Sequence, residues 1–125
     1  MTNSKLHRID LELAREPGHP EGDQNHTYRL YLPLRDDAHI DVSALPHMKA
    51  WCRVVRHRPG EDETRGRIRK DTGGRWILDY TDTDSRDDEI GFRLAEERFV
   101  TGEYVSIEED DGQMHTFRVV SVRPD

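Results

Sequence analysis

Apolar residues in this chain recur at every second position in short runs, and each run ends at glycine, proline or acidic residues. In the first run, Ile9, Leu11 and Leu13 alternate with charged residues, and residues 28–34 repeat the pattern with Tyr28 and three leucines. A period of two is typical of a β-strand with one buried and one solvated face. The pattern therefore predicts an all-β chain.

Further runs with the same character follow along the chain. They cover residues 51–57, 64–70, 75–80, 104–107 and 115–122. One short helical turn is expected over residues 43–50, with Ser43 as its cap and Pro46 limiting its length. We predict a single all-β domain over residues 1–125, a small barrel or sandwich of about seven or eight mostly antiparallel short strands. Residues 16–25, with two prolines and two glycines, are expected to form a long exposed loop.

Two hairpins can be placed from their turn residues. Gly73 and Gly74 mark a tight turn, because glycine accepts the positive φ that such turns require. Near the C-terminus, a three-residue loop ending in a left-handed Gly112 puts Val105 opposite Phe117. A two-residue loop would put Val105 opposite Arg118 instead, so the three-residue loop keeps the apolar side chains on one face.

The composition limits what this domain can enclose. Only 33% of the 125 residues are hydrophobic and 36% are charged, so the core must be thin and a deep cofactor cavity is not expected. No apolar run approaches the roughly 20 residues of a membrane helix, and the first residues lack the apolar stretch of a signal peptide. The single cysteine, Cys52, excludes an internal disulfide. We expect a cytoplasmic protein without membrane or cofactor.

Charge is unevenly distributed along the chain. Residues 51–76 hold eight basic and four acidic side chains, whereas residues 79–112 hold three basic and thirteen acidic ones. The acidic residues are expected in loops at 82–89 and 108–111. Residues 82–87 begin like a calcium loop, but Arg86, Asp87 and Arg93 stand where an EF-hand needs a ligand, a glycine and a glutamate. A solvated acidic loop is the favoured interpretation.

Three arginines in the basic segment share one face of a predicted strand. Arg65, Arg67 and Arg69 alternate with Gly66 and Ile68, so all three project from the same side. Such a row predicts either pairing with the acidic loops or binding of nucleic acid phosphates. The complete set for nucleic acid binding adds Arg53, Arg56 and Arg75. The nearby Trp51 and Trp76 alternate with apolar residues and are expected in the core.

Histidines and the cysteine carry weaker chemical signals. The seven histidines include no pair at the spacing of a zinc site, so no metal site is predicted. His7 and His115 are expected on strands and, with Tyr104, define a ligand or catalytic site in a barrel mouth as one alternative. Cys52 alternates with Val54 and is expected to be a small buried hydrophobe rather than a nucleophile. No catalytic motif was found.

Several segments carry a resemblance to known sequences. These are residues 88–93, 98–100, 102–107, 111–112 and 115–122, and more loosely Gly73-Gly74-x-Trp76 and His7-Arg8-Ile9. Together they resemble a family of small uncharacterised bacterial proteins. The resemblance implies a bacterial origin and a cytoplasmic setting, and it transfers no activity, ligand or catalytic residue.

These observations favour a non-enzymatic binding module for a protein or peptide. Its thin core, its lack of a catalytic constellation and its separated charges suit a surface that steers partners. The partner would add a strand at an exposed edge over residues 27–34 or contact the charged faces. Nucleic acid binding through the arginine row and a small-ligand or enzymatic site at a barrel mouth are the alternatives. The oligomeric state is left open.

Overall fold

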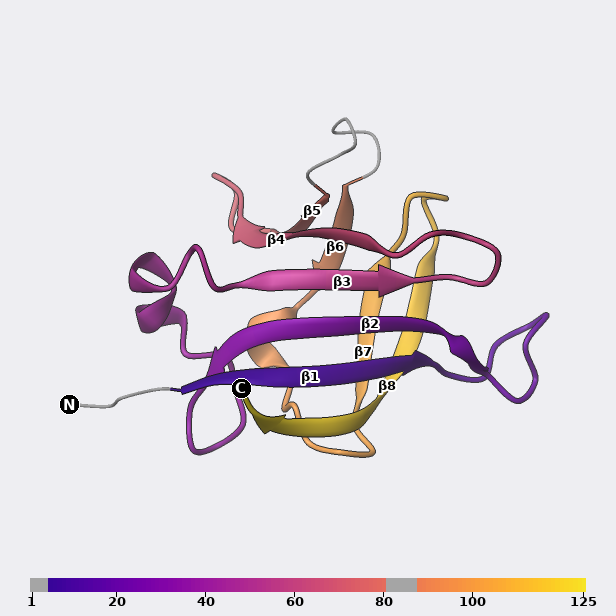
Figure 1. The fold of residues 1–125 in the computed structure, drawn as a ribbon, viewed down its shortest axis with the longest axis horizontal. Coiled ribbons are helices and arrows are strands. Elements are labelled where there is room, and N and C mark those ends of the chain that lie inside the picture. Colours follow the sequence, from indigo (N-terminus) through magenta and orange to yellow (C-terminus); the bar gives the residue numbers. More distant parts are fainter. Residues whose placement is uncertain (1–4, 81–87) are drawn as a thin grey trace.

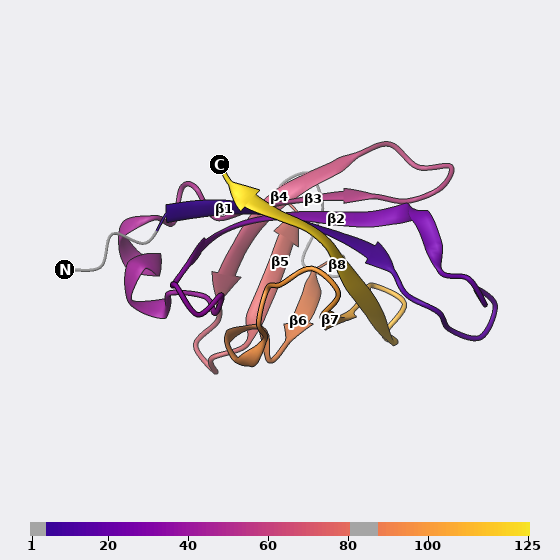
Figure 2. The same cartoon turned by 90° about the horizontal axis from the view of Figure 1, so that it is seen from below.

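A computed structural model of the chain describes residues 5–80 and 88–125. Within these residues the chain forms a closed antiparallel barrel in which each strand pairs with the next and β8 pairs with β1 (Figures 1 and 2). The strands are β1 (Lys5–Leu13), β2 (Asp23–Leu34), β3 (Arg53–His57), β4 (Thr64–Lys70), β5 (Trp76–Tyr80), β6 (Glu89–Phe92), β7 (Tyr104–Glu108) and β8 (Met114–Pro124). The all-β prediction is confirmed, and of the two predicted architectures the barrel is the one observed.

The interior follows from the alternation in the sequence. Ile9, Leu11 and Leu13 of β1 are all buried, and so are the inward-facing residues of the strands on either side. Inward-facing Gly91 of β6 leaves room for a residue from outside the sheet, because a Cβ at this position would lie 2.5 Å from Leu94 Cδ1. Leu94 thereby packs into the core from a short 3-10 helix, η3 (Leu94–Glu96).

The predicted C-terminal hairpin register is confirmed. Val105 lies opposite Phe117 and Ile107 opposite His115, and Gly112 has a φ of 75° at the end of the three-residue loop. The turn between β4 and β5 also forms as expected, with Gly74 at a φ of 83°. In both hairpins glycine occupies the left-handed position that the turn requires.

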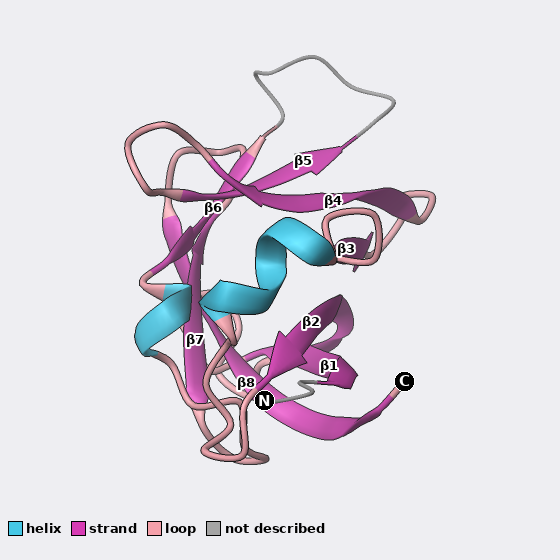
Figure 3. Cartoon of the chain, turned by 90° about the vertical axis from the view of Figure 1, so that its left-hand side faces the viewer, coloured by secondary structure: helices cyan, strands magenta, loops and turns pink. Residues whose placement is uncertain are grey.

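The helical turn is present but its cap differs from the prediction. It is a 3-10 helix, η1 (Val42–His47), and Asp41 rather than Ser43 is the capping residue, with its side chain accepting a hydrogen bond from the Ser43 backbone N–H. Figure 3 looks onto the end of the barrel where η1 and η3 lie, here called the helix end. The opposite end, bordered by the β1–β2, β3–β4 and β7–β8 connections, is called the mouth.

Strand β2 has no free edge, which corrects the prediction of an exposed edge at residues 27–34. Residues 27–34 pair with β1, residues 27–31 pair with β3, and the backbone of Pro33 and Leu34 contacts Asp41 and Ile40. A partner therefore cannot add a strand there. Of the predicted loop at 16–25, residues 23–25 belong to the start of β2.

Two other sequence-based expectations lie at the limits of what the structure describes. The calcium-like segment at residues 82–87 lies outside the described residues. Among the described residues no helix has the length and apolar character needed to cross a lipid bilayer.

Candidate functional site

Four arginines and one tyrosine, one residue from each of five neighbouring strands, form a line across the outside of the barrel. The strand registers place Arg123 of β8 opposite Arg8 of β1, Arg8 opposite Tyr31 of β2, Tyr31 opposite Arg53 of β3, and Arg53 opposite Arg67 of β4. Four spacings of about 4.8 Å between strands give this line a length of about 19 Å. Closure of the barrel is what brings together residues 8 and 123 from the two ends of the chain.

Further basic residues border this line on β2 and β4. Arg65 and Arg69 share the outer face of β4 with Arg67, as the sequence predicted, and Arg29 lies on the outer face of β2. We call the line, together with Arg29, Arg65, Arg69 and the Trp51 side chain that precedes β3, the basic face. It comprises Arg8, Arg29, Tyr31, Trp51, Arg53, Arg65, Arg67, Arg69 and Arg123.

Most arginines of the basic face have an acidic partner, and these pairs are partly open to water. Arg65 pairs with Glu63 at 3.1 Å, and Arg69 pairs with Asp79 at 3.0 Å. The side chain of Arg67 makes no hydrogen bond or ion pair within the described residues. Because exposed ion pairs contribute only about 0–1 kcal/mol, an incoming anion can replace the acidic partners at little expense.

Aromatic rings accompany the arginines. Trp51 is 58% exposed, which corrects the prediction that it belongs to the core, whereas Trp76 is buried as predicted. Trp51 follows the outward alternation of β3, two residues before Arg53, and the guanidinium of Arg53 lies 4.3 Å from the centre of the Tyr31 ring. An exposed indole beside guanidinium groups is a surface on which a planar ring can stack.

Two of the predicted nucleic-acid-binding residues lie elsewhere. Arg56 points into the barrel and is only 6% exposed, because it shares the inward alternation of Val54. Arg75 lies in the β4–β5 turn, where its Nε donates to Asp71 Oδ2 at 2.8 Å. Asp71 also accepts hydrogen bonds from the backbone N–H groups of Gly73 and Arg75, so this pair braces the turn.

A second group of polar residues fills the inside of the mouth. The sequence analysis placed Glu89 and Glu109 in exposed acidic loops, but both are buried, with exposed fractions of 0% and 5%. Glu89 accepts a hydrogen bond from the Tyr80 hydroxyl, and the Tyr28 hydroxyl, which has a single proton to donate, lies within hydrogen-bond distance of both Glu89 and Glu109. We call the whole group the mouth cluster. Its members are His26, Tyr28, Arg56, Arg58, Tyr80, Glu89, Glu109 and His115.

Arginine guanidinium groups compensate the buried carboxylates. Arg58 Nη2 lies 2.7 Å from Glu89 Oε2 and 3.4 Å from Glu109 Oε2, and it also contacts Asp110. Arg56 Nη1 lies 3.2 Å from Glu89 Oε2. The guanidinium carbon of Arg56 also lies over the Tyr80 ring, 4.5 Å from the ring centre. A buried carboxylate requires such partners, because its burial without compensation is strongly unfavourable.

The two buried carboxyl groups have different proton affinities. Burial raises the pKa of Glu89 above its usual range, and the attraction of Arg56 only partly opposes this effect. Burial also acts to raise the pKa of Glu109, but hydrogen bonds from His26 and Tyr28 outweigh it and lower that pKa. Burial and the nearby Glu89 raise the pKa of Tyr28 well above its usual value. The carboxylates of the cluster are hydrogen-bonded, whereas Arg56 Nη1 and Arg58 Nε are buried without a hydrogen-bond partner within the described residues.

The proposed small-ligand residues do not come together. His115 lies at the mouth, where its Nδ1 faces Glu16 at 3.0 Å and its Nε2 faces Asp111 at 2.9 Å. His7 lies at the other end of β1, opposite Pro124, and Tyr104 is exposed on the outside of β7. A barrel-mouth site made of His7, His115 and Tyr104 is therefore wrong.

Metal and thiol chemistry find no support in the described part of the chain. No group of three or more histidine, cysteine or acidic side chains has the arrangement of a metal site there. Cys52 is buried, as expected, and burial raises the pKa of its thiol to about 11. A thiol with that pKa is protonated at neutral pH and is a poor nucleophile.

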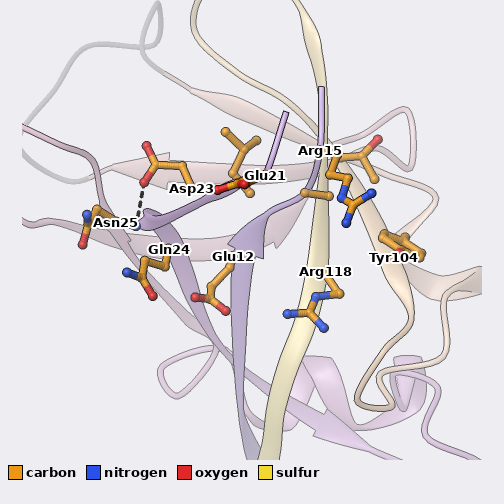
Figure 4. A pocket seen from close by; sticks show the side chains of 12 residues that line it. Glu12, Arg15, Glu21, Asp23, Gln24, Asn25, Tyr104 and Arg118 are labelled. Carbon is orange, nitrogen blue, oxygen red and sulfur yellow. Dashed lines mark hydrogen bonds between the residues drawn. The ribbon is translucent and has the colours of Figure 1, made fainter. Parts of the chain in front are cut away.

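A groove runs along the outside of the barrel near the mouth, between the start of β2 and strands β1, β7 and β8 (Figure 4). Its volume is about 1080 Å³. Glu12, Arg118 and Tyr104 form its floor, because the registers place Glu12 opposite Arg118 and Arg118 opposite Tyr104. The register of the β1–β2 ladder shifts between Glu12 and Leu13, where residues 24–26 of β2 have no partner on β1, and this irregularity borders the hollow.

Sequence reasoning missed the mouth cluster, although the sequence holds a signal for it. Each member follows the inward alternation of an apolar run: His26 and Tyr28 precede Leu30, Arg56 and Arg58 follow Val54, and Glu109 follows Ile107. A polar residue at an inward position of a strand is the pattern to look for. Such a residue must be hydrogen-bonded within the barrel.

Comparisons of this chain with protein-family models, with curated proteins and with solved structures each returned no match.

Proposed function

We propose that this protein is a non-enzymatic binding module that holds single-stranded nucleic acid on its basic face. The observation that carries the proposal is the line of Arg123, Arg8, Arg53 and Arg67 across five strands, with Tyr31 of β2 within it. Guanidinium groups in a row suit a strand of phosphates, and each can donate two hydrogen bonds to a phosphate.

Exposed aromatic rings favour nucleic acid over an acidic protein as the partner. Trp51 offers a ring face beside the phosphate-binding groups, and stacking of a base on such a ring contributes about 1–3 kcal/mol. An acidic protein would use the arginines but would not need the indole. The net charge of −7 is unevenly distributed, because thirteen of the 26 acidic residues lie between residues 79 and 112; of these, Asp79 and Asp88 pair with Arg69 of the basic face.

Fluorescence anisotropy with labelled single-stranded RNA and DNA of mixed sequence tests the proposal. We expect binding that weakens with salt, with a slope of log K against log salt of about −2 to −3 for three to four phosphate contacts. Arg67→Ala should weaken binding and make that slope less negative by about 0.7. Trp51→Ala should weaken binding without changing the slope.

Arg98→Ala is the matched control, because Arg98 is exposed but lies in the β6–β7 connection outside the basic face. It should leave affinity and slope unchanged. Absence of binding at low salt, or equal losses in the Arg67 and Arg98 variants, would overturn the proposal. Comparison of RNA with DNA of the same sequence shows whether a 2′-hydroxyl is recognised.

A further inference from the structure

The groove beside the mouth is lined by polar side chains that are not used elsewhere in the structure. Within the described residues, Glu12, Arg15, Glu21, Gln24 and Arg118 line the groove and make no side-chain hydrogen bond or ion pair. This contrasts with the mouth cluster, in which carboxylates, guanidinium groups and hydroxyl groups are paired with one another. The groove therefore offers hydrogen-bonding capacity to a ligand.

The lining supplies donors and acceptors in nearly equal measure. Arg15 and Arg118 donate, Glu12 and Glu21 accept, and the amide of Gln24 does both. Asp23 adds a third carboxylate, which also accepts a hydrogen bond from the Asn25 backbone at 2.8 Å. Three carboxylates against two guanidinium groups leave little net charge. A strongly charged ligand would gain little here, whereas a neutral ligand that both donates and accepts would be well matched.

An exposed ring completes one side of the groove. Tyr104 is 55% exposed and stands two strands from Glu12, which is about 10 Å across the floor at the usual strand spacing. In Figure 4, Gln24, Glu12, Arg118 and Tyr104 succeed one another along the groove. The order is an amide, a carboxylate, a guanidinium and an aromatic ring. The ring offers a flat apolar face at the end of a polar trough.

We propose that this groove binds a neutral oligosaccharide, with one sugar ring stacked on Tyr104 and the hydroxyl groups of the next held by Arg118 and Glu12. A sugar hydroxyl is both a donor and an acceptor, as the lining requires. The C–H face of a pyranose is apolar and covers an aromatic ring, while the open, polar shape of the groove disfavours an apolar ligand. This site is separate from the basic face and does not depend on it.

Ligand-observed NMR and calorimetry with maltotriose, cellotriose and tri-N-acetylchitotriose test the proposal. At least one of these neutral trisaccharides should bind at millimolar concentration, and its affinity should not change with salt. Tyr104→Ala should reduce that affinity at least about tenfold, and Tyr104→Phe should retain it, because stacking needs the ring and not the hydroxyl. Both changes are at an exposed position, where folding is little affected.

Met114→Ala is the matched control, since Met114 is 49% exposed on the same β7–β8 hairpin but does not line the groove. It should leave trisaccharide affinity unchanged. Absence of binding to all three trisaccharides, or equal losses for Tyr104→Ala and Met114→Ala, would overturn the proposal. Binding of a short peptide of mixed charge, such as Lys-Gly-Glu, in place of the sugars would assign the groove to a peptide instead. Nucleic acid binding should weaken with salt, whereas trisaccharide binding should not, so the salt dependence of affinity distinguishes the two sites.

Discussion

The two halves of the barrel interior are built on opposite principles. Towards the helix end, leucine and phenylalanine side chains such as Leu32, Leu34 and Phe99 fill the space and need no particular partner. Towards the mouth, Glu89 and Glu109 are equally buried but each depends on specific donors. The apolar half accepts hydrophobic substitutions of similar volume. In the charged half, removal of one carboxylate leaves buried guanidinium groups without a compensating charge. In both halves, the buried side chains are the ones at every second position of a strand.

The largest effect should come from removing one carboxylate of the mouth cluster. We expect Glu89→Ala to lower the free energy of unfolding by about 3–5 kcal/mol, because two guanidinium groups and two tyrosine hydroxyl groups lose their shared partner inside the barrel. Urea denaturation measures this change in the free energy of unfolding. Glu61→Ala, at an exposed position in the β3–β4 connection, should change stability by less than about 0.5 kcal/mol. Equal stabilities of the two variants would contradict the comparison.

A cavity in the apolar half should have a smaller effect. Leu32→Ala removes a fully buried side chain and is expected to lower the free energy of unfolding by about 3 kcal/mol. Since no ionisable group loses a partner, the dependence of stability on pH should stay as in the unaltered protein. Urea denaturation at several pH values checks both statements, and a changed pH profile would show that the two halves are coupled.

Loss of a single hydroxyl in the mouth cluster should rank third. Tyr80→Phe removes a donor to Glu89 while keeping the ring under Arg56, so we expect a loss of about 1.5 kcal/mol. Thermal unfolding followed by circular dichroism measures this change. Tyr104→Phe removes an exposed hydroxyl and should have no measurable effect. A stability loss of the same size in both variants would argue against a role for the buried hydrogen bond.

Protonation of His115 should give the smallest effect. Burial acts to lower the pKa of His115, but Asp111 and Glu16 outweigh it, and the pKa lies above the usual value of about 6.5. The folded protein therefore binds this proton more tightly than the unfolded chain does. The resulting stabilisation is complete below about pH 6.5 and is lost as the pH rises through the folded pKa.

The stabilisation from protonated His115 should be about 1 kcal/mol or less, because Glu16 and Asp111 are partly exposed. His115→Gln should remove this part of the pH profile, which urea denaturation between about pH 5 and pH 9 would reveal. NMR titration of the imidazole ring gives the pKa directly. A ring that titrates below about 6.5 would contradict the interpretation.

The strands and the C-terminal register were predictable because they depend on local patterns. Alternation around Ile9 and the left-handed preference of Gly112 act within a few residues, so the sequence displays them. Closure was not predictable, because pairing of β1 with β8 joins segments more than 100 residues apart. The line of arginines depends on that closure and on four registers at once. The exposure of Trp51 depends on where β3 begins, which propensity does not define.

The candidate sites were predictable only in part. Arg65 and Arg67 share an exposed face, as their spacing indicated, but Arg56 has the opposite orientation because it is three residues from Arg53. Glu89 and Glu109 were assigned to loops from their acidic neighbours alone. Their burial follows from partners as distant in sequence as Tyr28, which no local window includes.

Closure of the barrel also has a consequence for how the protein folds. Among the described strands, every ladder except one joins elements that are consecutive in the chain, and the exception joins β1 to β8. Contacts between consecutive strands enclose short loops and can form early, whereas the β1–β8 ladder must bring the two ends of the chain together. We expect this ladder to form after the transition state, so that substitutions such as Ile9→Val accelerate unfolding and leave the folding rate nearly unchanged. The last ladder to form would then be the first to open, which makes it the element that sets the lifetime of the folded barrel.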